Sequence, residues 1–312
     1  MIEFNRIYVL ELLPAGDEKT GTQLHNDLLR WQGFKYNGFE SVLLEPKTKI
    51  EWNRMIGDIL ADTQNKGIRP IIHFEIHGST KKDGLVLASG ELVLWKEIGA
   101  ILTEINIASR MNLFISLAVC HGAYLLTQYH LDQRAFCYGV LCSFDPLPVD
   151  DLKIRFCEFY EELFSTFDIV KAYQRLLNAN PDIEIDYECI SAVEIFYKNY
   201  RNYVLEQVND PERVKERALE AANENGVVLT TRQQKRAFQR NFAKVMHQKK
   251  NEYYVEHSTK FLMTDLFPEK KADFHLPDTL DKFMEMKIIP QNYLGTVVNY
   301  LNKHSELIPS VL

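Results

Sequence analysis

Two short glycine-containing segments, His77-Gly78 and Cys120-His121-Gly122, carry residue types suited to nucleophilic catalysis. A free thiol has a pKa of about 8.5, so it is mostly protonated at neutral pH; an imidazolium beside it stabilises the reactive thiolate and later protonates a leaving amine. Glycine after the histidine lets a carbonyl approach the backbone, and the N–H groups of Gly78 and Cys120 are suited to stabilise an oxyanion. The two segments therefore predict a Cys–His dyad if the fold brings them together.

Alternating strand-like and helix-like segments in the first two thirds of the chain predict an α/β fold, with a mostly parallel sheet flanked by helices. Residues 84–87 and 91–94 flank a glycine-containing turn and predict an antiparallel hairpin. The other expected strands lie at 7–10, 41–44, 71–76, 113–119, within 135–143 and at 187–191, and the expected helices at 20–31, 49–65, around 98–105, 150–167, 169–178 and up to 203.

The two candidate residues follow two of these strands. His77 comes directly after strand 71–76, and Cys120 directly after the apolar strand 113–119. In an open α/β sheet, ligands bind outside the carboxyl ends of the strands. We therefore expect the thiol and the imidazole at the same rim of the sheet.

The composition changes beyond Asn209-Asp210-Pro211, where charged and amide residues dominate and strand-like runs almost vanish. We expect an α/β domain over residues 1–209 and a helical C-terminal region over residues 210–312. Seven Lys and Arg residues and no acidic residue lie between Thr231 and Lys250, beside an apolar stripe that includes Phe238 and Met246. This stretch predicts either a solvated helix packed on its own domain or a docking surface for a protein partner or an acidic ligand.

The bulk properties limit the class of protein. A net charge of −7 gives no overall field that attracts nucleic acid or anionic lipid. No run approaches the roughly 18 apolar residues of a membrane span, and residues 1–6 lack the order of a signal peptide, so we expect a cytoplasmic protein. The five cysteines are an odd number without metal-type spacing, which predicts reduced thiols and no metal site.

The order of these features resembles the caspase-like cysteine peptidases. A strand, His77-Gly78, a hairpin, a helix and a hydrophobic strand ending in Cys120-x-Gly122 follow one another over roughly residues 5–205, and a histidine about 50 residues before the nucleophile is also the caspase arrangement. The hairpin segment from Asp83 to Leu87 and the run from Asn112 to Ile115 are similar to those of the bacterial CHAT-type proteases. The resemblance implies a cysteine endopeptidase that needs no cofactor and cleaves a protein substrate. It also implies a bacterial setting in defence or cell death, for instance with a gasdermin-like substrate.

Two departures change what the resemblance implies. The segment Ala118-Val119-Cys120-His121-Gly122 keeps only Cys-x-Gly of the caspase signature, so aspartate specificity is not supported. In related families the residue two before the nucleophile lines the substrate pocket, and Ala118 there implies an uncharged or hydrophobic preference. Asp83 or Asp145 in the pocket would instead select Lys or Arg.

The link from Leu131 to Arg134 is too short for the cleavable segment of processed caspases. It implies a single-chain enzyme, controlled through a partner, an inhibitory segment or oligomer formation, with the C-terminal region as the candidate for that control.

Other polar residues near the dyad have plainer interpretations. Consecutive residues leaving a strand tend to point to opposite sides, so we expect His121 to be a neighbour rather than the base. His73 and Glu75 share a face with His77 and predict a buried hydrogen-bonded pair, or a carboxylate that orients a histidine. Core packing is the expected role of the remaining cysteines, which are Cys137, Cys142, Cys157 and Cys189. A catalytically silent caspase-like scaffold that binds a partner protein is the alternative to the enzyme.

Overall fold

The computed structural model describes residues 3–286, which form two compact units. Within these residues the first unit comprises 3–130 and 134–192, and the second comprises 131–133 and 193–286. The predicted boundary after residue 209 thus falls inside the second unit, and a functional division between 1–209 and 210–312 stays a prediction. Each unit is described by itself below.

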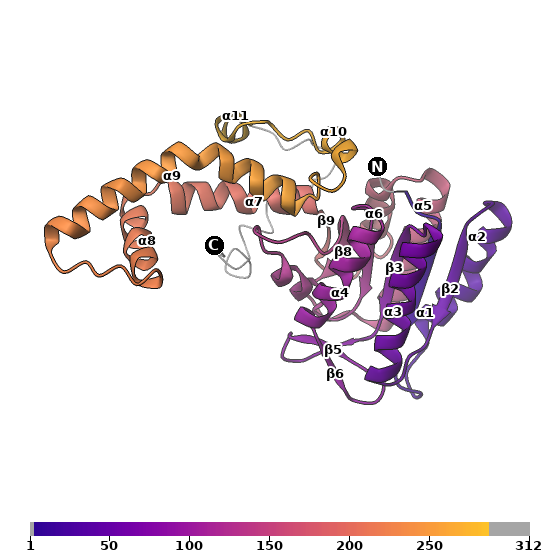
Figure 1. The fold of residues 1–312 in the computed structure, drawn as a ribbon. Helices are drawn as coiled ribbons and strands as arrows, with labels where there is room; N and C mark the ends of the chain where they lie inside the picture. The colour runs from indigo at the N-terminus through magenta and orange to yellow at the C-terminus, as the bar shows by residue number, and fades with distance from the viewer. Residues whose placement is uncertain (1–2, 287–312) are drawn as a thin grey trace. The chain divides into compact units, whose positions relative to one another are not determined.

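A six-stranded sheet forms the centre of the first unit (Figure 1). Its strand order is β2-β1-β3-β7-β8-β9; only β9 runs antiparallel to its neighbour, so the predicted α/β class with a mostly parallel sheet is confirmed. The central strands are apolar along most of their length because helices cover both faces of the sheet. The strands are β1 (Arg6–Glu11), β2 (Glu40–Leu44), β3 (Pro70–Glu75), β7 (Phe114–Ala118), β8 (Gly139–Ser143) and β9 (Tyr187–Ser191).

Helices lie on both faces of this sheet (Figure 1). On one face are α3 (Lys49–Lys66) and α4 (Trp95–Ala108). The opposite face carries α1 (Thr20–Leu24), the π-helical turn His25–Leu29, α5 (Val149–Thr166) and α6 (Ile169–Asn178), while α2 (Arg30–Lys35) follows the turn. Helix α3 starts at a Thr48–Glu51 capping box and ends at Gly67, whose left-handed backbone with φ 64° is typical of a helix C-terminus.

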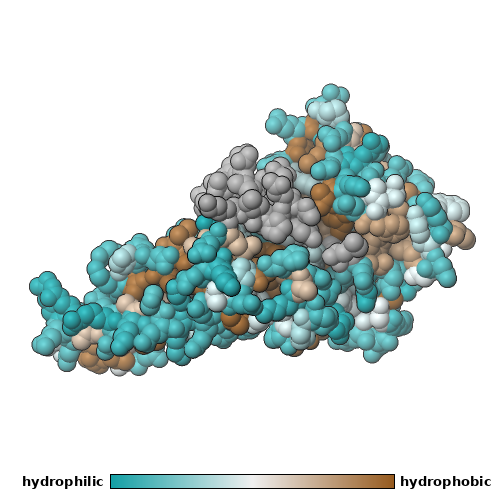
Figure 2. All heavy atoms as spheres, turned by 90° about the horizontal axis from the view of Figure 1, so that it is seen from above, coloured by the Kyte–Doolittle hydropathy of each residue, from teal (hydrophilic) through white to brown (hydrophobic). Residues whose placement is uncertain are grey.

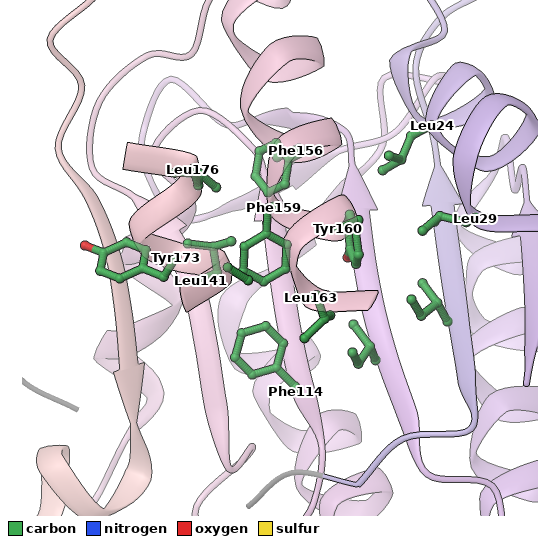
Figure 3. Packing of buried hydrophobic residues seen from close by; sticks show 14 of the residues in the cluster. Leu24, Leu29, Phe114, Leu141, Phe156, Phe159, Tyr160, Leu163, Tyr173 and Leu176 are labelled. Atoms are coloured by element: carbon green, nitrogen blue, oxygen red, sulfur yellow. The ribbon is translucent and has the colours of Figure 1, made fainter. Parts of the chain in front are cut away.

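The main hydrophobic cluster lies between the sheet and α5 (Figure 3). Phe114 of β7 stacks on Phe159 of α5 with ring centroids 6.4 Å apart, and Phe159 meets Tyr160 edge to face. Leu24 and Leu29 close the cluster from the helical segments that follow β1. The cluster fixes α5 and the segment after β1 on the face of the sheet that also carries Ala118 and Cys120.

The predicted hairpin is confirmed, as β5 (Gly84–Val86) and β6 (Leu92–Leu94) pair antiparallel. A third strand, β4 (His77–Gly78), adds to β5 and makes a small separate sheet. Two residues are too few to show a period of two in the sequence, so β4 had no signal of its own. Strand β4 starts at His77, so the chain leaves the six-stranded sheet between Glu75 and His77 and joins the small sheet.

Helices alone make up the second unit within the described residues. An aromatic cluster of Phe196, Tyr200, Tyr254, Phe261 and Phe283 joins three of them. The elements are α7 (Ala192–Tyr203), the π-helical turn Val204–Val208, α8 (Pro211–Glu224), α9 (Arg232–Phe261), the 3₁₀ turn Pro268–Lys270, α10 (Lys271–Phe274) and α11 (Leu280–Glu285). The basic stretch 231–250 is the first part of α9, a single helix of 30 residues that begins at a Thr231–Gln234 capping box. Across residues 3–286, no helix is both long and apolar enough to cross a membrane.

Candidate active site

The two strands that precede His77 and Cys120 are direct neighbours in the sheet. Strands β3 and β7 pair in parallel, and the last paired residues are Glu75 and Ala118. His77 and Cys120 each lie two positions beyond this pair, so both follow the carboxyl ends of adjacent strands. The predicted placement of the two residues at one rim is therefore confirmed.

The backbone of Gly78 lies directly against the carbonyl group of Cys120. A Cβ atom built on Gly78 would be 1.8 Å from the Cys120 oxygen. No side chain fits in that space, so the contact requires glycine. The contact places the His77-Gly78 segment directly against the segment Cys120-His121-Gly122.

The Cys120 thiol is half-buried and packs against the edge of the hydrophobic cluster. Its Sγ accepts a hydrogen bond from the Leu147 N–H at 3.3 Å. The thiol also lies 4.0 Å from the Leu147 carbonyl oxygen, so the main chain of Leu147 positions Sγ through both of its polar groups. Leu147 lies in the loop after β8, and sequence reasoning missed it because a main-chain contact depends on the fold and not on the side chain.

Two backbone N–H groups remain beside the thiol. In an antiparallel pair, hydrogen-bonded and non-hydrogen-bonded residue pairs alternate. Ser79 N–H donates to the Gly84 carbonyl, so Gly78, opposite Leu85, falls in a non-hydrogen-bonded pair and its N–H faces away from β5. Cys120 N–H has no acceptor within residues 3–286. Their role as donors to an oxyanion stays a prediction.

His77 has a carboxylate partner that sequence reasoning missed. Its Nε2 is 2.6 Å from Oδ2 of Asp17, and the two side chains are 52% and 40% exposed. A proton on Nε2 would leave Nδ1 as the nitrogen that can accept one. No hydrogen bond joins His77 to Cys120 within the described chain. Asp17 lies in the loop after β1, the neighbour of β3, so the rule of converging strand ends could have identified it.

A buried polar network supports the loop that carries Asp17. Glu11, at the end of β1, accepts hydrogen bonds from the backbone N–H groups of Gly21 and Thr22 at 2.9 and 3.1 Å. Glu75, its registered neighbour on β3, accepts from the Thr20 hydroxyl at 2.8 Å. These bonds fasten the start of α1 to the two strands, and they leave little freedom to the preceding loop.

The prediction of a buried His73–Glu75 pair is confirmed. Nε2 of His73 is 3.1 Å from Oε1 of Glu75, and Nδ1 is 3.0 Å from the Ser116 hydroxyl on β7. His73 is fully buried and Glu75 is 2% exposed. Both hydrogen-bond partners of the His73 imidazole are therefore buried side chains. Glu75 bonds to His73 and Thr20, and no hydrogen bond joins it to His77 among the described residues.

His121 has its own partners away from the thiol. Its backbone is left-handed, with φ 59°, and its N–H donates to the Asp145 carbonyl. Nδ1 of the ring is 2.6 Å from the Phe144 carbonyl oxygen. These contacts fit the expected neighbouring role and leave His77 as the candidate base.

The three predicted pocket residues have different surroundings. Ala118 is 3% exposed and belongs to the main hydrophobic cluster. Asp145 accepts a hydrogen bond from the Asp186 N–H at 3.0 Å, so one of its oxygens connects two loops. Asp83 is half-buried, and its enclosed Oδ1 has no hydrogen-bond partner among the described residues. Their role in substrate selection stays a prediction.

All five cysteines are free thiols, as predicted. Cys137 and Cys142 are fully buried, and this burial raises the pKa of both thiols far above the ordinary value. Burial also raises the pKa of the half-buried Cys157 thiol. A raised pKa lowers the thiolate fraction at neutral pH, so these three cysteines are poor nucleophiles.

Replacing Asp17 by asparagine tests the carboxylate as a positioning residue. Both side chains are well exposed, so we expect kcat to fall by only about fivefold, the usual size of an exposed charged contact. KM should stay unchanged, because Asp17 acts through His77. Glu18→Gln is the matched control, since the Glu18 carboxylate pairs with Lys153 and Gln23 instead. Equal losses in the two variants would exclude a specific role for Asp17.

No family model matches the sequence, and none of the curated proteins matches it either.

Among residues 3–286, no three side chains of His, Cys, Asp and Glu gather in a way that could hold a metal ion.

Proposed function

We propose that the chain is a single-chain cysteine endopeptidase of the caspase-like, CHAT-type group, with Cys120 as nucleophile and His77 as proton-transfer partner. The observation that carries this proposal is the contact of Gly78 with the Cys120 carbonyl. It joins the two segments that the resemblance singles out.

The reaction uses groups that the rim provides. The Cys120 thiolate attacks a peptide carbonyl, and the N–H groups of Cys120 and Gly78 stabilise the oxyanion. His77, held by Asp17, gives its proton to the leaving amine, and the C–N bond breaks. Water then hydrolyses the thioester and restores the thiol.

The caspase-like and CHAT-type assignment rests on the order of features that the sequence resembles. Three features support it: the mostly parallel sheet, the hairpin between the two segments, and the position of both residues just beyond the carboxyl ends of β3 and β7. A cytoplasmic place in a bacterial defence or cell-death system, with one dedicated protein substrate such as a gasdermin-like protein, is part of the same proposal. The substrate side chain before the cut is neutral or hydrophobic if Ala118 determines it, and basic if Asp83 or Asp145 does.

Covalent labelling distinguishes this enzyme from a catalytically silent scaffold. The probe is a mixture of thiol-reactive peptidyl inhibitors that carry neutral, hydrophobic or basic residues at the cleavage position. We expect the label mainly at Cys120, because burial keeps Cys137, Cys142 and Cys157 in the thiol form, and peptide mapping reports separately on the half-buried Cys189. Intact mass gives the number of labels per chain, and peptide mapping identifies the labelled cysteine. The inhibitor that reacts fastest shows which side chain the substrate pocket prefers.

The His77→Ala variant is the control for this labelling. An activated Cys120 should lose most of its label in this variant, since the imidazole no longer promotes the thiolate. Labelling spread over several cysteines, or labelling of Cys120 that is independent of His77, would favour the scaffold. The absence of any label would also contradict the enzyme.

A further inference from the structure

The second unit contains a large groove that the proposed protease chemistry does not use. It has a volume of about 910 Å³ and lies between α9 and the segment where the turn after α7 meets α8. Val208 and Val214 line it on one side, and Ala243 and Met246 line it on the other. On the face that Figure 2 shows, hydrophilic residues predominate in this unit, with apolar patches among them.

The α9 side of the groove has the spacing of a helix-packing seam. The lining positions 232, 236, 239, 243, 246 and 250 alternate steps of four and three residues, which is the heptad pattern of helices that pack side by side. Yet the buried residues of α9 are Tyr254, Ser258 and Phe261, all in its last third. Helix α8 packs beside this first part, where Gln239 Nε2 donates to the Lys215 carbonyl, and the lining face of α9 next to it stays exposed or half-buried.

The charge of the groove is of one sign. Its lining contains Lys215, Arg232, Arg236, Arg240 and Lys250, together with His247, and no acidic residue. Lys215 and Lys250 pair with Glu212 and Asp281, whereas the three arginines form no ion pair within residues 3–286.

The arginines are also unfavourable for α9 by itself. Arg232, Arg236 and Arg240 follow one another at intervals of four residues, so they are neighbours on the helix surface and repel one another. Arg232 and Arg236 lie near the helix N-terminus, where the helix dipole disfavours cations. A partner that brings carboxylates to this face would remove both costs.

The lining favours a peptide over the other occupants. Among the described residues no Phe, Tyr or Trp lines the groove, so His247 is the one ring there on which a nucleic-acid base could stack. The chain's own residues 287–312 carry two lysines and only one glutamate, so their charge does not complement it. Apolar side chains at Val214, Ala243 and Met246, flanked by arginines, match an amphipathic helix with an apolar stripe and acidic flanks.

We propose that the groove between α8 and α9 binds an acidic amphipathic helix of a partner protein. Leucine-like side chains of the partner pack against Ala243 and Met246, and its carboxylates pair with Arg232, Arg236 and Arg240. The part of α9 from 232 to 250 is about 27 Å long, which accommodates a partner helix of about 18 residues. The proposal is independent of Cys120, so it stands or falls separately from the protease.

The test uses the full chain with Cys120→Ala, so that binding is measured without cleavage. The probe is a fluorescent helical peptide of about 18 residues, with leucine at the heptad seam positions and glutamate elsewhere. We expect measurable binding by fluorescence anisotropy that weakens as salt rises. A matched peptide with glutamine in place of glutamate should bind at least about tenfold more weakly.

Paired charge reversals on α9 locate the binding site. Arg236→Glu with Arg240→Glu reverses two groove residues and should weaken binding by about thirtyfold or more. Lys235→Glu with Lys244→Glu makes the same charge change on the same helix outside the groove lining and should weaken it by less than about threefold. Circular dichroism checks that both variants keep their helix content.

Four results would overturn the proposal. Equal losses in the two double variants would show general attraction rather than a site, and equal binding of the glutamine peptide would remove the role of charge. Tighter binding of a single-stranded DNA oligonucleotide than of the acidic peptide would assign the groove to nucleic acid. Failure to bind the peptide would also refute the proposal, and a dimer dispersed by the Arg236→Glu, Arg240→Glu pair would then assign the groove to a second copy.

Discussion

Replacing Cys120 by alanine is expected to lower peptide cleavage by at least about a thousandfold, because nothing else at the rim can form the acyl-enzyme. His77→Ala should cause a loss of similar order, since the thiolate and the protonation of the leaving amine both depend on the imidazole. Residues that act as one unit are not additive, so the double variant should be little worse than either single one. Initial rates on a peptide library, read by mass spectrometry, measure these losses.

His121 provides the matched control for the dyad. It is adjacent to Cys120, but its ring is held by the Phe144 carbonyl. Asparagine tolerates the left-handed backbone at this position better than alanine does, so His121→Asn should keep cleavage within about threefold of the parent. Unchanged cleavage in Cys120→Ala or His77→Ala, or a complete loss in His121→Asn, would refute the assignment of the dyad.

The second large effect is expected from Gly78→Ala. The new methyl group would be 1.8 Å from the Cys120 carbonyl oxygen, a distance that requires backbone movement. Overpacking costs about 1–3 kcal/mol in the free energy of unfolding, and we expect the upper end of this range because backbone atoms must move. The displaced segments would also separate His77 from Cys120, so the rate of Cys120 labelling should fall together with the stability. Urea denaturation and labelling kinetics measure the two effects.

Gly57→Ala is the same substitution without the clash. Gly57 lies within α3, and a Cβ atom there would meet nothing within 4 Å. Alanine in a helix interior is more favourable than glycine by roughly 0.5–1 kcal/mol, so this variant should be slightly more stable and label normally. A Gly78→Ala protein as stable and as reactive as the parent would show that the contact with Cys120 is not needed.

The spacing of apolar residues predicted most elements of the first unit, because most of its strands and helices are long enough to show a period of two or of 3.6 residues. The apolar run before Cys120 becomes β7, and the turn at residues 88–90 joins β5 to β6. The short β4 escaped prediction because two residues show no period. No bounds were predicted for α9, whose 30 residues combine a basic first part with the buried Tyr254, Ser258 and Phe261 near its end.

The site was predicted as far as residue type and strand ends allow. His77 and Cys120 were expected at one rim, and the register of Glu75 with Ala118 puts them there. Asp17 was missed, because a carboxylate in a loop is ordinary until a partner lies 2.6 Å away. The Leu147 N–H is a backbone group, which every residue but proline carries, so no sequence pattern could single it out as a partner of the thiol.

The sequence by itself determined the strands, the hairpin, the two glycine-containing segments and the uninterrupted positive charge of residues 231–250, because these follow from side chains close together along the chain. Only the tertiary structure decided that β3 lies beside β7, that Gly78 lies against the Cys120 carbonyl and that α8 leaves a groove along α9. These are contacts between segments far apart or differently oriented in the chain. They depend on how buried surfaces pack, and local patterns do not specify that packing.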